Sequence, residues 1–504
     1  MDRKRIIIIG GGMAGLCAGA YLQMNGYDVT IFEKNSTAGG VCTSWKKGNY
    51  TIDLCIHWLV GSGPASSFYE RWSELIDLNE VKFVNRDEYF RVEDEHGNYI
   101  RVFSHIERLE HEFLLRAPED EDEIRMFTHG LRCLATFDMQ TEKAPELANL
   151  WDRLKSFIRL IPYLGTFQKY MNLTCRQYSE RFKNPLLKKV MQNLPGPDMG
   201  IIFGMITLTW FHNKTAGYPI GGSLAFSERI LEAYVQLGGK IVFNADVHKI
   251  LTANNTALGI ELVNGQRHTA DYTISAADGH ATIFEMLEGR YTDAELLKFY
   301  RTAKRFPSLI FISIGVRRKL SRLPNMTLIP LPEPIIVDPE TSVNDLIIHT
   351  HNYDPTLAPA GSTLLTFMLE TYNYDYWNDL HRHDKRRYDN EKARILAEVI
   401  QVLEKRVGDV ARYVEMTDVA TPVSFRNFSG NWNGSFEGWL MTPETGLKHL
   451  SHTLPGLQNF YMCGQWVAVG GGLPGVLLSG RDTAQIICHK DGLRFEADKT
   501  LVIA

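Results

Sequence analysis

The 504-residue sequence lacks several features that mark broad classes of protein. No stretch reaches the roughly 18–20 apolar residues of a membrane-spanning helix, and the nearest candidate, residues 199–211, is too short. The net charge of −5 excludes the basic surplus that nucleic-acid binding requires. Seven cysteines occur without C-x-x-C spacing, which favours reduced thiols in a cytoplasm. The sequence also has no P-loop, no G-x-S-x-G and no H-E-x-x-H motif, and we expect no metal ion.

The first forty residues carry the most informative pattern. Residues 6–9 are four isoleucines, as expected of a strand buried on both faces of a parallel sheet. A G-x-G-x-x-G turn occupies residues 10–15, and a helical pattern follows as far as Asn25. Residues 29–32 form a second strand pattern that ends at Glu33. This order predicts a dinucleotide-binding βαβ unit.

Each residue of this motif has a physical role. Gly10 permits the tight turn, Gly12 lets the backbone approach a diphosphate, and Gly15 lets the helix pack close to the strand. The free N–H groups at the start of the helix favour the negative charge of the diphosphate. Glu33 is placed to accept hydrogen bonds from a ribose. A secretory signal is not expected here, because three glycines interrupt the apolar run that a signal needs.

The pattern changes several times along the rest of the chain. Residues 105–215 show helical periodicity, and residues 391–403 form another helical stretch. We interpret residues 241–243, 247–250 and 259–262 as the strands of a meander. Further strands are expected at residues 272–275 and, in a separate antiparallel sheet, at residues 309–316, 346–351 and 363–369.

A second glycine-rich tract lies near the C-terminus. A strand pattern at residues 459–464 is followed by glycines at 470, 471, 472 and 475 and by a helical stretch at residues 476–487. Too little chain remains for a second βαβ unit of 30 or more residues. We therefore interpret the tract as a close approach of backbone to a ligand, and we expect no separate NAD(P)H domain. The alternative is an ordinary strand–loop–helix connection that closes the domain.

Together these motifs resemble the phytoene desaturase branch of the FAD-dependent amine-oxidase-like superfamily, which includes retinol saturase and carotenoid isomerase. The resemblance rests on the N-terminal motif extended to Gly39-Gly40, on residues 218–222, on Thr421-Pro422 and on the C-terminal tract. It implies FAD as the cofactor. The cofactor-binding residues expected from the motifs and the resemblance are Gly10, Gly12, Met13, Ala14, Gly15, Glu33, Lys34, Gly39, Gly40, Val41, Val247, Ala277, Gly464, Gly472, Gly475 and Val476.

The sequence departs from the family at a few positions. Val41 stands where the family usually has arginine or lysine, and Gln465 where an acidic or small residue is common. After Asp53 the family more often has a glycine, and it rarely has a His-Trp pair such as His57-Trp58. We consider His57 as a catalytic proton donor or substrate anchor over the flavin, and with equal weight as a packed histidine that has no catalytic role.

The expected fold is α/β, with a discontinuous Rossmann-type FAD-binding domain. This domain comprises residues 1–100, 216–290 and 421–504. A helical cap is expected at residues 101–215 and an antiparallel-sheet substrate domain at residues 291–420. Within the cap, residues 153–171 alternate apolar and basic side chains around Pro162, which is typical of a helix pair at a membrane surface. Residues 201–208 are expected to complete an apolar entrance, although all these residues could instead pack against the protein's own core.

The resemblance implies an FAD-dependent oxidoreductase that acts on carbon–carbon bonds of a hydrophobic polyene or isoprenoid. Desaturation, saturation and isomerisation all stay open. Two alternatives are an amine oxidase on the same fold and a flavin-free prenyl carrier resembling the GDP-dissociation inhibitors. We expect a cytoplasmic protein with peripheral membrane association and no nucleic-acid partner.

Overall fold

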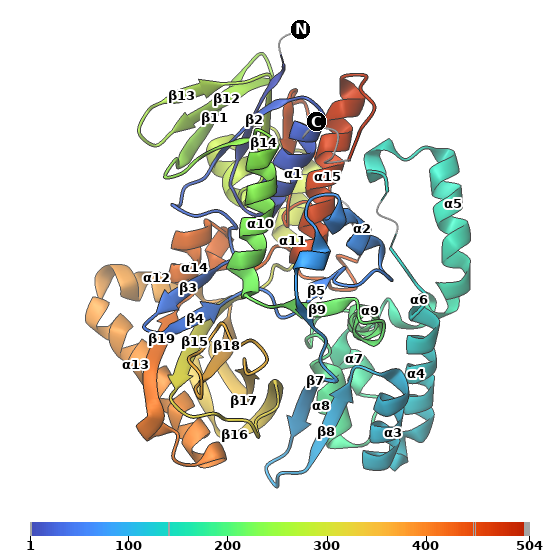
Figure 1. Ribbon diagram of the computed structural model, residues 1–504, viewed down its shortest axis with the longest axis vertical. Coiled ribbons are helices and arrows are strands. Elements are labelled where there is room, and N and C mark those ends of the chain that lie inside the picture. Colours follow the sequence, from blue (N-terminus) through green and yellow to red (C-terminus); the bar gives the residue numbers. More distant parts are fainter. Residues whose placement is uncertain (1–2, 140–141, 447, 449, 498–504) are drawn as a thin grey trace.

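A parallel five-stranded sheet forms the nucleotide-binding part of the computed structural model, which describes residues 3–139, 142–446, 448 and 450–497 (Figure 1). Its strands are β1 (Arg5–Ile9), β2 (Asp28–Phe32), β10 (Lys240–Val242), β14 (Tyr272–Ser275) and β20 (Phe460–Met462). The strand order is β10-β2-β1-β14-β20, and every pairing is parallel. The four isoleucines of the central strand β1 are buried, as the sequence predicted.

Three helices pack together beside this sheet. They are α1 (Met13–Met24), α10 (Gly222–Gln236) and α15 (Gly472–Lys490). Helix α1 is buried along its whole length because the other two helices and the sheet surround it. Its glycines allow the close contact: a Cβ on Gly19 would lie 2.8 Å from the Tyr234 ring of α10. Gly480 of α15 similarly lies against the backbone of α1 at Ala18.

A small antiparallel sheet follows, with strands β11 (Val247–Ala253), β12 (Thr256–Leu262) and β13 (Arg267–Thr269). The predicted meander is therefore present, but residues 241–243 do not belong to it. Residues Lys240–Val242 instead pair in parallel with β2 at the edge of the large sheet. A three-residue strand cannot reveal its partner from local pattern alone, because pairing depends on the tertiary fold.

The second large sheet has the order β19-β15-β18-β17-β16-β7-β8 and is antiparallel except between β16 and β7. Its strands are β7 (Glu88–Glu93), β8 (Tyr99–Phe103), β15 (Ser308–Val316), β16 (Met326–Asp338), β17 (Thr341–Thr350), β18 (Thr363–Thr371) and β19 (Val414–Ala420). Helices α12 (Tyr374–His383) and α13 (Lys385–Val407) pack beside it. The sequence analysis assigned the chain up to residue 100 to the nucleotide-binding domain. In the structure β7 and β8, within residues 88–103, belong to this second sheet. The division into domains otherwise stays a prediction.

The helical part lies on the other side of the molecule in Figure 1, and it shares its core with β7 and β8 of the second large sheet. Its helices are α3 (Ile106–Arg116), α4 (Glu121–Leu134), α5 (Leu150–Leu160), α6 (Leu164–Tyr170), α7 (Cys175–Ser179), α8 (Pro185–Gln192) and α9 (Ile201–His212). Residues 201–208 lie in α9, where Ile201, Ile202 and Met205 are fully buried. The expectation that they form part of an apolar entrance is therefore wrong, because they fill the core of the helical part.

Short elements connect these three parts. They are β3 (Ser44–Lys47), β4 (Tyr50–Asp53), β5 (Leu59–Val60), β6 (Phe83–Val84), β9 (Ala216–Pro219), α2 (Ser67–Ser73), α11 (Ala294–Thr302), α14 (Pro422–Ser429), the 3₁₀ helices η1 (Leu78–Glu80), η2 (Pro118–Asp120), η3 (Pro145–Leu147), η4 (Ile161–Tyr163), η6 (Ala411–Tyr413) and η7 (Trp432–Gly434), and the π-helix η5 (Ala281–Met286). Within the described ranges, no helix has both the length and the apolar character needed to cross a bilayer.

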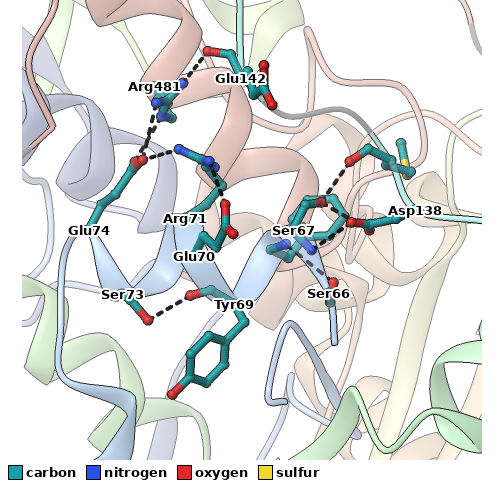
Figure 2. A network of polar contacts seen from close by, with 12 residues as sticks. Ser66, Ser67, Tyr69, Glu70, Arg71, Ser73, Glu74, Asp138, Glu142 and Arg481 are labelled. Atoms are coloured by element: carbon teal, nitrogen blue, oxygen red, sulfur yellow. Dashed lines mark hydrogen bonds and ion pairs between the residues drawn. The ribbon is translucent and has the colours of Figure 1, made fainter. Parts of the chain in front are cut away.

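A polar network, buried at Arg481 and exposed at Asp138, joins segments that are far apart in sequence (Figure 2). Arg481 of α15 donates from Nε to Glu74 Oε2 at 2.9 Å and from a terminal nitrogen to the Glu142 carbonyl at 2.8 Å. Glu74 also pairs with Arg71, on α2. Asp138 accepts hydrogen bonds from the backbone and hydroxyl of Ser67 at the start of α2. The network therefore ties the C-terminal helix to α2 and to the helical part.

We expect Arg481→Met to destabilise the protein by about 3 kcal/mol, near the low end for a broken buried ion pair, because Glu74 keeps Arg71 as a partner. Thermal or denaturant unfolding of the two proteins measures this loss. Arg108→Met is the matched control, since the pair of Arg108 with Asp87 is exposed and its removal should change stability by less than about 1 kcal/mol. Equal stability of the two variants would contradict a structural role for the network.

Candidate functional site

A cavity of about 820 Å³ opens at the carboxyl ends of the parallel strands. Such crevices are the usual ligand sites of open α/β sheets. Twelve of the sequence-predicted cofactor residues line this cavity: Gly10, Gly12, Ala14, Glu33, Lys34, Gly39, Gly40, Val41, Val247, Ala277, Gly464 and Val476. They come from segments near both ends of the chain and from its middle, so the fold brings the two glycine-rich tracts together as the sequence predicted.

The glycine turn has the geometry that a diphosphate requires. Gly10 has a left-handed φ of 96°, and its N–H donates to the Phe32 carbonyl. A Cβ on Gly15 would lie 2.1 Å from the Gly10 carbonyl oxygen, so helix and turn are in backbone contact there. At Gly12, in contrast, a Cβ would meet no protein atom closer than the Gly40 Cα at 3.8 Å. The space over Gly12 is thus free for a ligand, and the first N–H groups of α1 have no side-chain cap that competes for it.

Glu33 contributes to the shape of the turn as well as to the cavity wall. Its carboxylate accepts hydrogen bonds from the backbone N–H of Gly11 at 2.7 Å and of Asn35 at 2.8 Å. The side chain is buried, and these two bonds compensate its loss of water. Each carboxylate oxygen has a second lone pair, so the same group can still accept a hydrogen bond from a ribose.

The C-terminal tract closes the cavity from the other side. Gly464 has a φ of 103°, and a Cβ there would lie 3.1 Å from the Ala14 side chain of α1. The Gly464 N–H donates to Ser479 Oγ on α15 at 2.9 Å. The two tracts are therefore in contact around one cavity, and Val476 of α15 forms part of its wall.

The remaining predicted residues lie elsewhere. Met13 is buried in the core, and Gly15 is occupied by its contact with Gly10. Gly472 and Gly475 belong to the first turn of α15 but do not line the cavity. His57 also lies outside this lining.

His57 lies in the loop between β4 and β5, against the second large sheet. Its ring centroid is 4.7 Å from that of His349 on β17. Its Nδ1 is 3.2 Å from the Cys55 carbonyl, which can only accept, so Nδ1 carries the proton. Desolvation and the charge of Arg86 lower the pKa of His57 to about 4. At neutral pH the ring is uncharged, and its single N–H donates to the Cys55 carbonyl. This argues against proton donation by His57 to a substrate and leaves Nε2 as a hydrogen-bond acceptor.

The sequence did not identify several residues around the cavity. Residues 426–431, at the end of α14, line it, and Lys34 Nζ donates to the Asn427 carbonyl across its rim at 2.8 Å. Asp278 also lines the cavity, and burial raises its pKa to about 6. The proline at the start of α14 and Gly430 at its end predict a helix, but no local pattern places that helix beside Lys34.

Glu437 is a second residue that the sequence did not identify. Its Oε2 would lie 3.0 Å from a Cβ on Gly471, the residue before α15, so the carboxyl group packs against the C-terminal glycine tract. Its neighbour Gly438 contacts the Gln465 backbone, and Gln465 lines the cavity. Among the described residues, no hydrogen bond or ion pair reaches the Glu437 carboxyl, and burial raises its pKa to about 8.

Comparison with known proteins agrees with this site. A family model described as flavin containing amine oxidoreductase matches residues 13–488. The chain is 25% identical over 518 residues to a 1-hydroxycarotenoid 3,4-desaturase of Flavobacterium sp. (strain P99-3), covering 96% of this chain and 99% of that protein. It is 22% identical over 529 residues to prolycopene isomerase 1, chloroplastic, of an Oncidium hybrid cultivar, covering 97% and 85%. A solved putrescine oxidase variant with redesigned cofactor binding is similar with a TM-score of 0.63 at 14% identity, covering 97% and 99%.

These matches confirm the expected resemblance, the fold class and FAD as the cofactor. The likeness to putrescine oxidase, at 14% identity, shows the fold alone. Neither the amine oxidase nor the prenyl carrier is better supported than the oxidoreductase that the sequence favoured. The residues around the cavity fit FAD, because free space lies over Gly12 and α1 begins at the cavity wall.

We expect Gly12→Val to abolish FAD binding while the protein stays folded. The φ of −69° and ψ of 173° at Gly12 suit valine, and its side chain would enter only the cavity. Flavin absorbance per protein and circular dichroism measure the two properties. Gly15→Val is the contrasting variant: its side chain would overlap the Gly10 carbonyl, so folding itself should fail. Full flavin content in Gly12→Val would refute the assignment of the diphosphate site.

Glu437 should make stability depend on pH. Its pKa is raised in the folded protein, so the folded state binds the proton more tightly and stability falls as pH rises from about 4.5 toward 8. Glu437→Gln removes this dependence. We expect the Tm of the wild type, relative to the variant, to drop by on the order of 3 °C between pH 5 and pH 9. The exposed Glu95→Gln serves as control, and a parallel pH profile for wild type and Glu437→Gln would contradict the prediction.

Proposed function

This chain belongs to the flavin-containing amine oxidoreductase family and is an FAD-dependent enzyme, and we propose that it acts on carbon–carbon bonds of a long apolar polyene or isoprenoid. The observation that carries the proposal is the full-length similarity to enzymes named for carotenoid substrates, together with a cavity whose residues fit FAD. Desaturation, saturation and isomerisation are the three candidate reactions. The similar proteins include both a desaturase and an isomerase, so their names do not select among them.

Bound FAD supplies the redox chemistry, as a donor or acceptor of hydride equivalents. The protein's own contribution is to bind and orient the two molecules and to exclude water. The place where the three parts of the fold meet is suited to this, since the loop that carries His57 and Trp58 meets His349 of β17 there. Ligand sites lie preferentially between such parts. We place the substrate beside His57, which contacts it as a neutral side chain.

Anaerobic mixing of the FAD-loaded protein with isoprenoids and their dihydro derivatives tests the proposal. Flavin absorbance and the products are followed together, with oxidised and with chemically reduced protein. We expect one of these substrates to change in unsaturation or geometry, and a redox reaction to change the flavin spectrum in step. Reduction of the flavin by amines, with no polyene altered in either redox state, would instead support the amine oxidase.

His57→Phe tests the contact with substrate. Because the ring is neutral, we expect KM to rise about tenfold while kcat changes little and FAD stays bound. His96→Phe is the control, since His96 is exposed on a distant hairpin. If turnover instead falls by roughly a hundredfold or more, His57 transfers a proton after all.

We further propose that the substrate reaches the protein from a membrane surface through α5, η4 and α6. Trp151, Phe157 and Ile161 are each more than half exposed, and no side chain of α5 is fully buried. Arg153, Lys155, Arg159 and Lys169 are interspersed along this segment. Apolar and basic groups on one exposed element suit the acyl boundary and anionic headgroups of a bilayer. Phe167, which the sequence counted among the interfacial residues, is buried.

Flotation with anionic vesicles measures this association. The wild type should float with the vesicles, and Phe157→Glu with Leu164→Glu should remain at the bottom, because each glutamate adds a charge to the inserted face. The matched control is Leu115→Glu with Val235→Glu, two exposed apolar residues on α3 and α10. Failure of the wild type to float, or equal flotation of both double variants, would exclude this surface.

A further inference from the structure

Arg86, between β6 and β7, is a cation at the junction of the three parts of the fold. Its side chain is partly buried. One terminal nitrogen donates to the His57 carbonyl at 2.8 Å, and the guanidinium lies 5.3 Å from the centre of the Tyr353 ring. Within the part of the chain that the structure describes, no carboxylate lies within 4.0 Å of Arg86. Most of its five N–H donors therefore remain available to a ligand.

The nearest acidic groups are already engaged with other partners. Asp53 accepts from the Tyr218 hydroxyl at 2.8 Å and from the Ser223 N–H at 3.1 Å. Asp354 accepts from the Gly221 N–H at 2.9 Å. Further acids on the segment of Arg86 pair with other arginines: Asp87 with Arg108, and Glu88 with Arg91. None of these carboxylates neutralises Arg86.

The histidines around Arg86 do not balance its charge either. His57, His349 and His351 lie together, with His351 Nε2 bonded to Thr366 Oγ1 at 2.8 Å. Desolvation is the main reason why the pKa of each is lowered, to about 4 for His57 and about 3 for His351. All three rings are uncharged at neutral pH. Arg86 is thus a cation with no directly paired carboxylate among the described residues, beside three uncharged and desolvated rings, where a matched anion gains most.

Apolar surface continues from this charge. Trp58, next to His57 in sequence, is partly exposed, and its ring lies 5.6 Å from Tyr89 and 5.5 Å from Phe211. The three rings come from the β4–β5 loop, from β7 and from α9. A cation beside aromatic rings fits a molecule that has an anionic end and an apolar body.

We propose that Arg86 binds a carboxylate at one end of an apolar chain whose body contacts Trp58. This inference rests on the proposed function, because it narrows the substrate class to polyene or isoprenoid acids. A planar guanidinium can hold a carboxylate through two parallel hydrogen bonds. An ammonium end would be repelled by Arg86, and a neutral end would leave its charge unpaired.

Binding of cis-parinaric acid and of its methyl ester to the FAD-loaded protein tests the proposal. Both are fluorescent polyenes of nearly equal apolar area, and at pH 8 only the acid is charged. We expect the wild type to bind the acid about 10- to 100-fold more tightly than the ester, as for a hydrogen bond to a charged group. Arg86→Gln should abolish this preference by weakening the acid alone, and Arg86→Lys should retain part of it. Arg108→Gln, an exposed neighbour, should behave as wild type.

Three results would overturn the proposal. Equal affinity of the wild type for acid and ester would show that Arg86 does not recognise the carboxylate charge of the probe. Equal weakening of both probes in Arg86→Gln, with Arg86→Lys restoring both, would show that Arg86 only holds the His57 loop. Absence of binding by either probe would reject the apolar site itself and would count against the proposed function as well. Flavin content and Tm of each variant distinguish these results from loss of folding.

Discussion

The backbone of helix α1 touches the Gly10 carbonyl at Gly15, and the position of the cofactor cavity follows from this contact. Without a side chain at residue 15, the helix begins directly above the end of β1, so its first N–H groups meet the space over Gly12. Glu33 then fixes the turn from the next strand by accepting the Gly11 N–H. The same absence of Cβ atoms recurs at Gly19 and Gly480, where α10 and α15 approach α1. A tightly packed, glycine-dependent centre thus determines where the glycine turn and the start of α1 lie in the cavity wall.

The remaining walls come from distant parts of the chain, and polar contacts hold them in place. Arg481 links α15 to Glu74 and to the Glu142 carbonyl, while Lys34 reaches the Asn427 carbonyl across the cavity rim. These interactions connect the first and last segments of the nucleotide-binding part, and the bond to Glu142 reaches the helical part. Arg481 is buried, so breaking its contacts costs more than breaking one of the exposed ion pairs of this protein.

The three histidines at the junction of the three parts carry no charge. His57, His349 and His351 are neutral because desolvation disfavours their protonated forms. Arg86 beside them is a cation, and no carboxylate of the described residues pairs with it directly. Neutral, desolvated rings beside one fixed cation suit an apolar substrate with one polar end, and they also strengthen the electrostatic contact that the substrate makes.

The sequence by itself determined the βαβ unit, because this unit depends on glycine spacing and strand periodicity over short distances. The resemblance to a known family implied FAD, and motifs and resemblance together identified twelve of the residues that line the cavity. It also predicted the antiparallel sheet and the division of the amphipathic segment at Pro162. Only the tertiary structure decided that Lys240–Val242 joins the parallel sheet, that β7 and β8 join the other sheet, and that α9 is buried. It alone brought Arg86 to His57 and Glu437 to Gly471. Pairing partners, burial and pKa values depend on contacts between residues distant in sequence, and local patterns carry no record of those contacts.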